Sequence, residues 1–474
     1  MQVRSMHFKA RAGGALGDAV LQANLRKFGA SGFALSRAKA VEAYGAAGFE
    51  RLRTAGAAIR DRALATLDAY VERFEREATR RGATVLFAET GAEACDLVLE
   101  ICRRHGVKKA IKSKSMLSEE AGLNDALAAA SVEPVETDLG EYIIQLAGEP
   151  PSHIIAPAVH KSKDEVADLF AAHHRAARKT DIGEMTREAR AVLRGHFVSA
   201  DLGISGGNFL IAETGSGLVV TNEGNGRMVT TLPRVHVCIT GIEKVIPTLE
   251  DFAALLRLLT RSATGQPISN YVSVFTGPRG AGDRDGPEHM YFILVDAGRT
   301  NLVGGDMQEM LRCIRCGACM NHCPVYRTVG GHAYGWVYPG PMGAVLTPSY
   351  VGLENALDLP HAATLCNQCG VVCPVKIPLP DLLRKLREKQ VERRLRPKGE
   401  MLGLRLWAWV AQRPRLYALA TRWAARALHV LGGPSRRFHR LRGASGWTRE
   451  RDFPAPQGAT FRDLYRKSGA GAPR

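Results

Sequence analysis

Seven of the ten cysteines lie in two short runs, and both runs end in Cys-Pro. The first run reads Cys313-x-x-Cys316-x-x-Cys319-x-x-x-Cys323-Pro324. This is the spacing of bacterial ferredoxins, in which three thiolates surround one iron–sulfur cluster and the cysteine before proline serves a second cluster. A structural zinc site would use two separate C-x-x-C pairs instead. The run therefore predicts a folded module that holds iron–sulfur clusters on soft thiolate ligands.

The second run, Cys366-x-x-Cys369-x-x-x-Cys373-Pro374, lacks one cysteine. Counting back from Cys-Pro places Ala363 where the first run has its first cysteine. Exchange of the fourth ligands between the runs then predicts two sets of thiolates. The first cluster takes Cys313, Cys316, Cys319 and Cys373, and the second takes Cys323, Cys366 and Cys369.

The set of three thiolates suits two kinds of cluster. A [3Fe–4S] cluster needs only three, whereas a [4Fe–4S] cluster would keep an open or non-cysteine corner. His361, Thr364 and Asn367 lie close in the sequence, but nothing ranks them as ligands. Because each run lends one ligand to the other, loss of Cys323 or Cys373 should damage the cluster that the opposite run mainly builds.

The other three cysteines are predicted to be buried free thiols. Cys95 and Cys102 are seven residues apart on the apolar face of an expected helix, and Cys238 lies in the strand-like run "RVHVCITG". Buried free cysteine behaves as a small apolar side chain. We therefore expect all three in the core rather than in a metal site.

The pattern along the chain divides it into four parts. Residues 1–75 are Ala-rich and helical, and residues 76–300 alternate strands with helices, which predicts an α/β domain with a mostly parallel sheet. After Asp201, short β runs separated by glycines, "RMVTTL" among them, predict a partly antiparallel section. Residues 301–395 carry the cysteines in a mainly helical ferredoxin-like domain, and residues 396–474 form a basic helical extension.

The net charge of +17 is concentrated at the C-terminal end of the chain. Residues 381–474 hold 23 Lys and Arg against 7 Asp and Glu, which leaves 41 basic and 40 acidic residues elsewhere. Trp407, Trp409, Tyr417 and Trp423 lie in amphipathic segments there, which Pro414 should break. This pattern favours docking on an acidic partner or a membrane face over a folded extension with solvated arginines. It disfavours nucleic-acid binding, because the basic charge is not shared by the whole chain.

Targeting and nucleotide-binding signals are missing from the sequence. No apolar run reaches the ~18 residues of a membrane span, and the first residues contain no apolar signal segment. We therefore expect a cytoplasmic protein, consistent with clustered cysteines that bind metal. Neither a G-x-G-x-x-G nor a P-loop motif occurs, so nothing predicts a nicotinamide, flavin or phosphoryl-transfer site in the chain.

Several long stretches resemble a known family. They are "KSKSMLSEEAGLN", "ETDLGEYIIQLAGEPPSHIIAPAVHK", "GNFLIAETGSGLVVTNEGNGRMVTTLP" and "GIEKVIPTLED", all similar to signature segments of the LUD domain. With the cysteine runs and "GWTRERDFPAP" near the end, nearly the whole chain resembles the lactate utilization protein B family. The resemblance implies an α/β domain related to ribose-phosphate isomerase (NagB/RpiA) and CoA transferase folds.

The resemblance also implies a function and partners. The family is the iron–sulfur subunit of a system that oxidises L-lactate to pyruvate, in which it passes electrons between partner subunits. Its partners are lactate utilization protein A, a cysteine-rich iron–sulfur protein, and protein C, a smaller LUD protein. The family pattern has three cysteines in the second run, and both clusters are generally described as [4Fe–4S].

The polar residues borne by the LUD stretches are candidates for a substrate site. They are Lys112, Lys114, Glu119, Asp138, Glu141, His153, His160, Glu223, Asn225 and Arg227. The segment "NEGNGR" is either a backbone nest that binds an anion beside Arg227 or a Gly-rich hairpin turn with a solvated arginine. His153 and His160 flank an apolar run, where structural histidines are more common than ligands.

The leading interpretation is therefore an electron-transfer subunit with two iron–sulfur clusters. The alternative is a self-contained oxidoreductase whose LUD domain binds the hydroxy acid and passes electrons to its own clusters. A nucleic-acid regulator is the third and least supported class.

Overall fold

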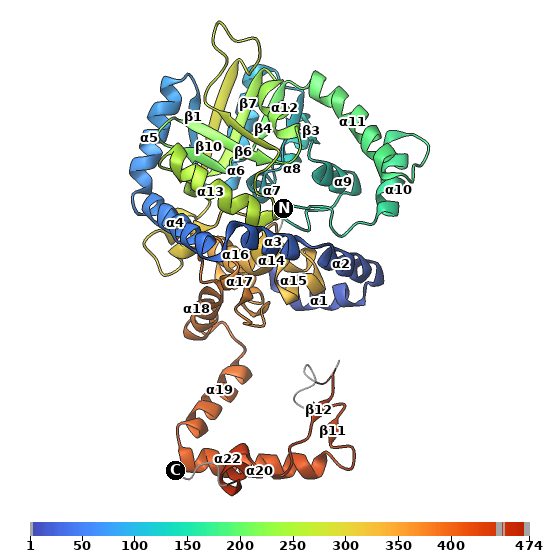
Figure 1. Ribbon diagram of the computed structural model, residues 1–474, viewed down its shortest axis with the longest axis vertical. Helices are drawn as coiled ribbons and strands as arrows, with labels where there is room; N and C mark the ends of the chain where they lie inside the picture. The colour runs from blue at the N-terminus through green and yellow to red at the C-terminus, as the bar shows by residue number, and fades with distance from the viewer. Residues whose placement is uncertain (1–2, 442–447, 449–450, 469–474) are drawn as a thin grey trace. The chain divides into compact units, whose positions relative to one another are not determined.

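The computed structural model describes residues 3–441, 448 and 451–468 (Figure 1). The chain separates into two compact units, Met1–Gln390 and Val391–Arg474. The first unit contains the sheets and both cysteine runs, and the second is mainly helical. In the described residues, no helix combines the length and the apolar character needed to span a membrane.

The second unit consists of helices with a two-stranded ribbon. Its elements are α19 (Lys398–Ala411), α20 (Pro414–Leu431), β11 (Arg437–Phe438), β12 (Phe453–Pro454) and α22 (Phe461–Lys467). The predicted break at Pro414 is confirmed, because α19 ends before it and Pro414 opens α20. Arg422 and Asp463 form an ion pair at 2.6 Å that ties α20 to α22.

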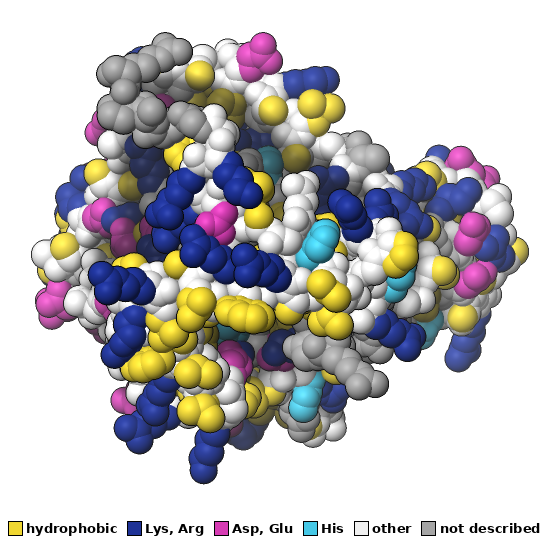
Figure 2. Space-filling view, turned by 90° about the horizontal axis from the view of Figure 1, so that it is seen from below, with side chains coloured by type: hydrophobic (Ala, Val, Ile, Leu, Met, Phe, Trp, Pro, Cys, Tyr) yellow, Lys and Arg dark blue, Asp and Glu magenta, His cyan; other side chains and the backbone are white. Residues whose placement is uncertain are grey.

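Large apolar side chains of this unit are exposed. Trp407, Trp409 and Trp423 are between 50% and 64% exposed, and Leu419 is equally open. In Figure 2, hydrophobic side chains lie next to a row of Lys and Arg side chains on one face.

The first unit is built round a six-stranded parallel sheet, as the α/β prediction required. Its spatial order is β1-β10-β7-β4-β2-β3. The strands are β1 (Thr84–Ala88), β2 (Lys109–Lys112), β3 (Glu133–Glu136), β4 (Leu202–Ser205), β7 (Val235–Gly241) and β10 (His289–Val295). In register, Tyr291 pairs with Thr84 on one side and Val237 on the other. Every residue of β7 is buried, as expected for a strand covered on both faces.

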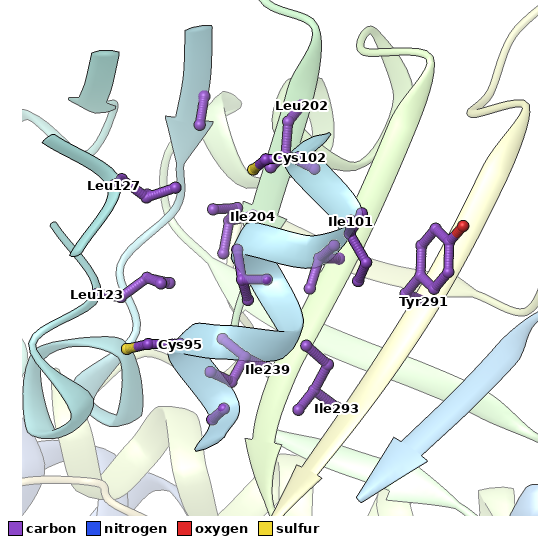
Figure 3. Close-up of a cluster of buried hydrophobic side chains, with 14 of the residues drawn as sticks. Cys95, Ile101, Cys102, Leu123, Leu127, Leu202, Ile204, Ile239, Tyr291 and Ile293 are labelled. Carbon is purple, nitrogen blue, oxygen red and sulfur yellow. The ribbon is translucent and has the colours of Figure 1, made fainter. Parts of the chain in front are cut away.

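Helices cover both faces of this sheet. They are α6 (Gly91–His105), α7 (Met116–Ala121), α8 (Leu123–Ala129), α9 (Leu139–Ala147), α10 (Lys163–His174) and α11 (Ile182–Ser199). Figure 3 shows the core on the α6 face, where Cys95 and Cys102 pack against strand side chains such as Ile204. Cys238 points to the opposite face and packs with α5. The prediction that these three cysteines are buried free thiols is confirmed.

A second sheet has the order β8-β5-β6-β9 and contains antiparallel pairs, as expected. Its elements and the adjoining helices are β5 (Phe209–Ile211), β6 (Ser216–Thr221), α12 (Asn225–Thr231), β8 (Val245–Ile246), α13 (Leu249–Ala263) and β9 (Tyr271–Phe275). The strand predicted for "RMVTTL" is wrong, because α12 occupies it. Val229 and Thr230 of α12 are buried, and packing of this helix on β4 outweighs the β preference of so short a run.

The N-terminal part is helical, as predicted, and supports the cysteine runs. Its helices are α1 (Phe8–Gly17), α2 (Ala19–Ser31), α3 (Phe33–Tyr44), α4 (Ala46–Ala65) and α5 (Leu67–Arg80). Arg53 Nε donates to the Cys373 carbonyl oxygen at 3.0 Å, and Arg37 Nη2 donates to the Val372 carbonyl at 2.9 Å. These contacts hold the second Cys-Pro segment in place.

Residues 301–390, which we call the cysteine module, contain short helices and loops. The helices are α14 (Ala318–Asn321), α15 (Pro324–Val329), α16 (Gly340–Val351), α17 (Gln368–Val371) and α18 (Leu379–Glu392). Short 3-10 helices in the first unit are Ser5–His7, Ile242–Lys244, Thr300–Leu302, Gln308–Arg312, His332–Tyr334, Leu353–Ala356 and Leu359–His361. The sequence predicted a mainly helical module. The helices are short because the chain turns repeatedly round the cysteines, and loops make up the rest of the module.

Candidate metal centre

The first thiol set comprises Cys313, Cys316, Cys319 and Cys373, and these four residues line one small cavity. Three of them come from the first run and the fourth from the second, the combination that ligand exchange predicts. The rest of the wall is largely apolar: Ile154, Met310, Ile314, Met342, Val375, Ile377 and Leu379. An apolar shell of this kind keeps water away from bound metal and tunes its potential.

The second thiol set comprises Cys323, Cys366 and Cys369, which line a separate cavity. Ala363, Thr364 and Asn367 lie in the same wall. His361 does not line it, since its Nε2 atom pairs with Gln390 Oε1 at 2.9 Å. Of the three neighbours that the sequence left unranked, Thr364 and Asn367 therefore remain beside the second set. Metal ligation by both sets stays a prediction.

The two cysteine loops have the same backbone shape. In the first, Arg315 and Gly317 have φ angles of 58° and 72°. Leu365 and Asn367 occupy the corresponding steps of the second loop, with φ angles of 54° and 64°. Positive φ is uncommon for residues other than glycine, so its recurrence at both steps marks a shared loop geometry. Ala363 therefore stands where the first loop carries its first cysteine.

We expect Ala363→Cys to give the second thiol set a fourth thiolate, because the loop is already shaped for it. The variant should bind a cluster that resists oxidative loss of iron, and its oxidised protein should show less [3Fe–4S] signal by EPR than the wild type. Ala362→Cys is the matched control, since Ala362 is buried but lies outside the cavity wall. Equal EPR spectra for Ala363→Cys and wild type would contradict the assignment of this position.

Backbone N–H groups point at the sulfurs. Arg315 N donates to Cys313 Sγ at 3.4 Å, and Ile377 N donates to Cys373 Sγ at 3.3 Å. Tyr326 N donates to Cys323 Sγ at 3.5 Å in the second set. Hydrogen bonds to sulfur stabilise negative charge on a cluster and are one of the protein's means of setting its potential.

Burial raises the pKa of the enclosed thiols of both sets. Burial, with smaller contributions from the Cys373 and Cys313 sulfurs, raises the pKa of Cys316 to about 12. Burial and the neighbouring Cys323 likewise raise the pKa of Cys369 to about 12. Crowded, buried thiols of this kind ionise only when a cation compensates their charge, which bound iron does. The core thiol Cys238 shows the same rise, so the fit to iron–sulfur clusters rests on the spacing of the cysteines and on their grouping round two cavities.

A large cavity of about 620 Å³ lies at the carboxyl ends of the parallel strands. Its wall includes Ser113 and Lys114, which follow β2, Gly206, which follows β4, and Gly241, the last residue of β7. In open parallel sheets, this edge is where ligands bind. The wall also includes Arg315 of the first cysteine loop, so the large cavity and the first thiol set share a boundary.

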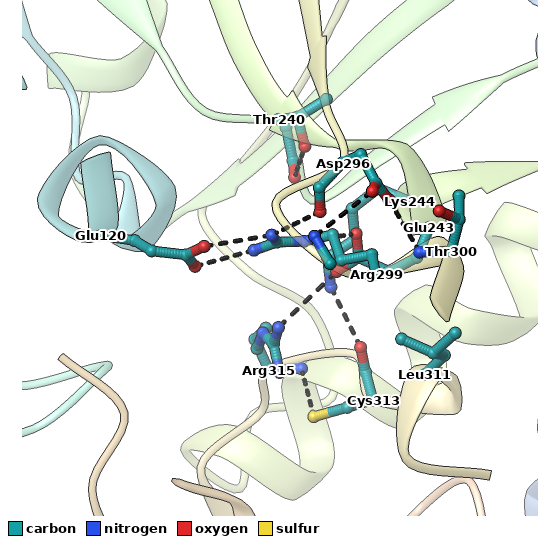
Figure 4. A network of polar contacts seen from close by, with 12 residues as sticks. Glu120, Thr240, Glu243, Lys244, Asp296, Arg299, Thr300, Leu311, Cys313 and Arg315 are labelled. Carbon is teal, nitrogen blue, oxygen red and sulfur yellow. Dashed lines mark hydrogen bonds and ion pairs between the residues drawn. The ribbon is translucent and has the colours of Figure 1, made fainter. Parts of the chain in front are cut away.

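A buried network of charged groups forms this boundary (Figure 4). Arg299 Nη2 lies 2.7 Å from Glu120 Oε2, and its Nε lies 3.1 Å from Glu243 Oε2. Arg315 Nη2 lies 3.6 Å from the other oxygen of Glu243. Burial opposes ionisation of Glu243, but Arg299 and the cations Lys244 and Arg315 outweigh it and lower its pKa to about 2. The network joins the LUD sheet to the cysteine module.

Lys244 is the most unusual member of the network. Its side chain is buried, and its Nζ atom donates to the Cys313 carbonyl oxygen at 3.0 Å. Burial and the neighbouring Arg315 lower the pKa of Lys244 to about 7. Glu243, Lys244, Arg299 and Arg315 were not among the residues predicted from the sequence. The available signal was a pair of charges, Glu243 and Lys244, between two apolar runs of a family segment.

The candidate LUD residues fall into separate groups. Lys112 is buried, with Nζ 2.6 Å from both Glu136 Oε1 and Asn124 Oδ1 and 3.4 Å from Glu119. Glu141 is buried beside this group, and burial together with Glu136 holds its pKa well above the usual range. This group therefore lies inside the domain and does not line the large cavity.

Four of the candidates do line the large cavity: Lys114, Asp138, Glu223 and Asn225. Arg227 does not, because it lies on α12, donates to Ser273 Oγ at 3.2 Å and stacks on Tyr271. Neither an anion-binding nest beside Arg227 nor a hairpin turn at this arginine is present, since the segment begins a helix.

His153 and His160 lie where the LUD domain meets the cysteine module. His153 Nε2 pairs with Asn321 Oδ1 at 2.9 Å, and burial lowers the His153 pKa to about 4. His160 Nε2 pairs with Glu149 Oε2 at 2.7 Å, and the His160 ring contacts His332. His153 is a structural partner at this contact, whereas His160 forms with Glu149 and His332 a group whose potential metal-ligand atoms lie within 4.8 Å of one another.

Three family matches cover most of the chain. Residues 71–295 match the LUD domain, residues 309–377 match the 4Fe-4S dicluster domain, and residues 383–470 match the C-terminal region of lactate utilisation protein B. The second match assigns iron–sulfur binding to the segment that carries both cysteine runs. The expected combination of LUD and ferredoxin-type domains is confirmed.

Curated relatives agree over nearly the full length. Lactate utilization protein B of Bacillus licheniformis is 43% identical over 90% of this chain and 91% of its own. The protein of the same name from Bacillus subtilis is 43% identical over 88% of each chain. That of Bacillus cytotoxicus is 40% identical over 99% of each chain. The chain is a member of the lactate utilization protein B family.

Proposed function

We propose that this protein is the iron–sulfur electron-transfer subunit of a system that oxidises L-lactate to pyruvate. One observation carries the proposal: Cys373 of the second run lines the cavity of Cys313, Cys316 and Cys319, and Cys323 of the first run lines that of Cys366 and Cys369, within one compact unit. Two [4Fe–4S] clusters bound there supply one-electron transfer. The three-cysteine set leaves [3Fe–4S] as the other form of the second cluster.

The two thiol sets differ in what surrounds them. The first is enclosed by apolar side chains and borders the large cavity. In the second, Cys366 is exposed, and so are the adjacent Leu365 and Val371. We propose that redox partners dock at this exposed end. Lactate utilization proteins A and C are the candidates that the family suggests.

The alternative is a self-contained oxidoreductase whose LUD domain binds the hydroxy acid. The observation in its favour is the large cavity beside the first thiol set. The LUD sheet, with ligand-sized space at its carboxyl edge, also supports the proposed kinship with ribose-phosphate isomerase and CoA transferase folds.

Anaerobic reduction separates these two functions. L-lactate added to the isolated, iron-loaded chain should leave its visible absorbance unchanged if the protein is a relay, whereas adding proteins A and C should allow lactate to bleach it. Bleaching by lactate without partners would instead establish the self-contained enzyme. Lack of bleaching by dithionite would contradict both.

We further propose a cytoplasmic protein whose second unit attaches peripherally to the inner membrane face, with an acidic redox partner as the other candidate surface. Nucleic acid is not a proposed partner. Trp407, Trp409 and Trp423 supply apolar area next to arginines such as Arg413, which stacks on Trp409 at 4.2 Å. This composition is typical of interfacial helices.

Replacing all three tryptophans with serine should lower the fraction of protein that sediments with phosphatidylglycerol-containing vesicles by at least about tenfold, because each ring buries apolar area in the interface. Val198→Ser is the control, since Val198 is 76% exposed on α11 of the first unit. Unchanged sedimentation of the triple variant would contradict the proposal that the second unit binds membranes. Its loss of co-purification with proteins A and C would then identify a protein surface.

A further inference from the structure

The large cavity has the size and lining of a site for an organic molecule. Its volume of about 620 Å³ falls in the range of ligand pockets. Apolar side chains form one part of the wall, among them Phe33, Leu117, Ile154, Val219 and Leu259. An inorganic ion would have no use for this apolar wall, so an organic body is indicated.

The charged part of the wall lies against the first thiol set. Lys244, Arg299 and Arg315 all line the cavity there, together with the carboxylate of Glu243. Both oxygens of Glu243 are taken, one by Arg299 and one by Arg315. The carboxylate therefore lies between the two guanidinium groups and is also the nearby negative charge for Lys244.

Lys244 shares its nearest carboxylate, Glu243, with Arg299 and Arg315, so three cations have one carboxylate between them on this part of the wall. The Lys244 side chain is only 7% exposed, and its one hydrogen bond within the described residues is to the neutral Cys313 carbonyl. An ammonium has three donors, so two remain for another acceptor. Buried charges are normally paired, because an unpaired one is costly to remove from water. A buried excess of cations on the wall of an organic pocket therefore points to an anionic ligand.

We propose that the large cavity binds an organic anion, a carboxylate or a phosphate ester, whose charged group pairs with Lys244 beside the first thiol set. This inference deepens the proposed function and rests on it, because it places a small-molecule site at the enclosed end of the relay. It also explains why the LUD sheet and the cysteine module share a wall. Arg315 reaches both spaces and links ligand binding to the first thiol set.

The competing explanation for Lys244 is that it only balances the negative charge of metal bound to the first thiol set. The two accounts differ in one respect. A counter-ion for bound metal predicts no ligand in the cavity, whereas a ligand partner predicts saturable binding that depends on Lys244.

Equilibrium dialysis and calorimetry with the anaerobic, iron-loaded full chain test the proposal. The probes are L-lactate, pyruvate, glycerol 3-phosphate and inorganic phosphate, with uncharged methyl L-lactate as the control ligand. We expect one organic anion to bind at one site per chain and methyl L-lactate not to bind. Comparison of the carboxylate probes with the phosphate probes then shows which of the two charged groups the cavity binds.

Lys244→Met should weaken binding of that anion roughly 10- to 100-fold, since a charged hydrogen bond is lost, and Lys244→Arg should retain much of it. Lys108→Met, at an exposed residue just before β2, is the control and should change nothing. In the wild type, ligand binding should also lower the midpoint potential of the first cluster, because it brings negative charge near it.

A second variant covers the case in which Lys244→Met loads iron poorly. Ala263 lines the cavity at the end of α13, and Ala263→Phe should narrow the space and weaken binding while the iron content stays normal. Failure of all four anions to bind wild type, or binding unaffected by Ala263→Phe, would overturn the inference. If the same sample had normal iron content and were bleached by dithionite, the proposed electron-transfer function would stand although the ligand site would not.

Discussion

Replacing Cys373 with serine is expected to remove the cluster whose other ligands all come from the first run. Cys373 lines the cavity of Cys313, Cys316 and Cys319 rather than that of its sequence neighbour Cys369. Without it, the first thiol set falls to three and the buried corner has no replacement thiolate. The variant should lose about half of its iron, and the EPR signal that disappears should be that of the four-cysteine cluster.

The reciprocal variant sharpens this expectation. Cys323→Ser should spare the four-cysteine cluster and remove the other one, because Cys323 lines the cavity of Cys366 and Cys369. Cys95→Ser is the control and should keep all of its iron, since Cys95 is packed in the core of the LUD domain. If Cys373→Ser affected only the cluster of Cys366 and Cys369, the exchange of ligands would be wrong.

Arg299→Met should destabilise the first unit by roughly 3–5 kcal/mol, the cost of breaking a buried ion pair. Arg299 is almost fully buried and serves two carboxylates, Glu120 of α7 and Glu243 after β7. Its loss leaves both without their main counter-ion, and Tyr338 cannot compensate, as it already donates to Glu120 at 2.5 Å. The urea midpoint, followed by circular dichroism and cluster absorbance, should fall for both signals together.

The matched control is Arg104→Met. Arg104 also pairs with a glutamate, Glu100, but both side chains are more than half exposed. Exposed pairs one helical turn apart contribute only about 0.3–0.5 kcal/mol, so the midpoint should barely move. Equal destabilisation by the two variants would mean that the network in Figure 4 does not join the LUD sheet to the cysteine module.

The features that the sequence predicted well are those with a strong local pattern. The parallel sheet follows from alternating apolar strands and amphipathic helices, and the break at Pro414 follows from the chemistry of proline. Counting from Cys-Pro also located Ala363, and the matching loop shapes explain why simple counting works: Leu365 and Asn367 repeat the positive φ angles of Arg315 and Gly317.

Features that depend on contacts between distant segments were not predictable. The run Arg227–Leu232, which the sequence predicts as a strand, lies largely in helix α12, because a short run carries both patterns and only packing on β4 decides between them. Arg227 was a candidate for an anion site, yet the anion-facing lysine is Lys244. Lys244 and Arg315 come together only when the cysteine module folds against the LUD sheet. No spacing of residues in the sequence predicts this contact.

Iron counting combined with EPR spectroscopy on the anaerobically purified full chain tests the central claim most directly. The claim is that seven cysteines from two runs hold two clusters close together in one unit, and that each run lends one cysteine to the cluster of the other. The account predicts brown protein with iron for two clusters, bleaching by dithionite, and a reduced spectrum broadened by coupling between neighbouring clusters. Colourless protein that carries zinc, or iron sufficient for one cluster only, would contradict it.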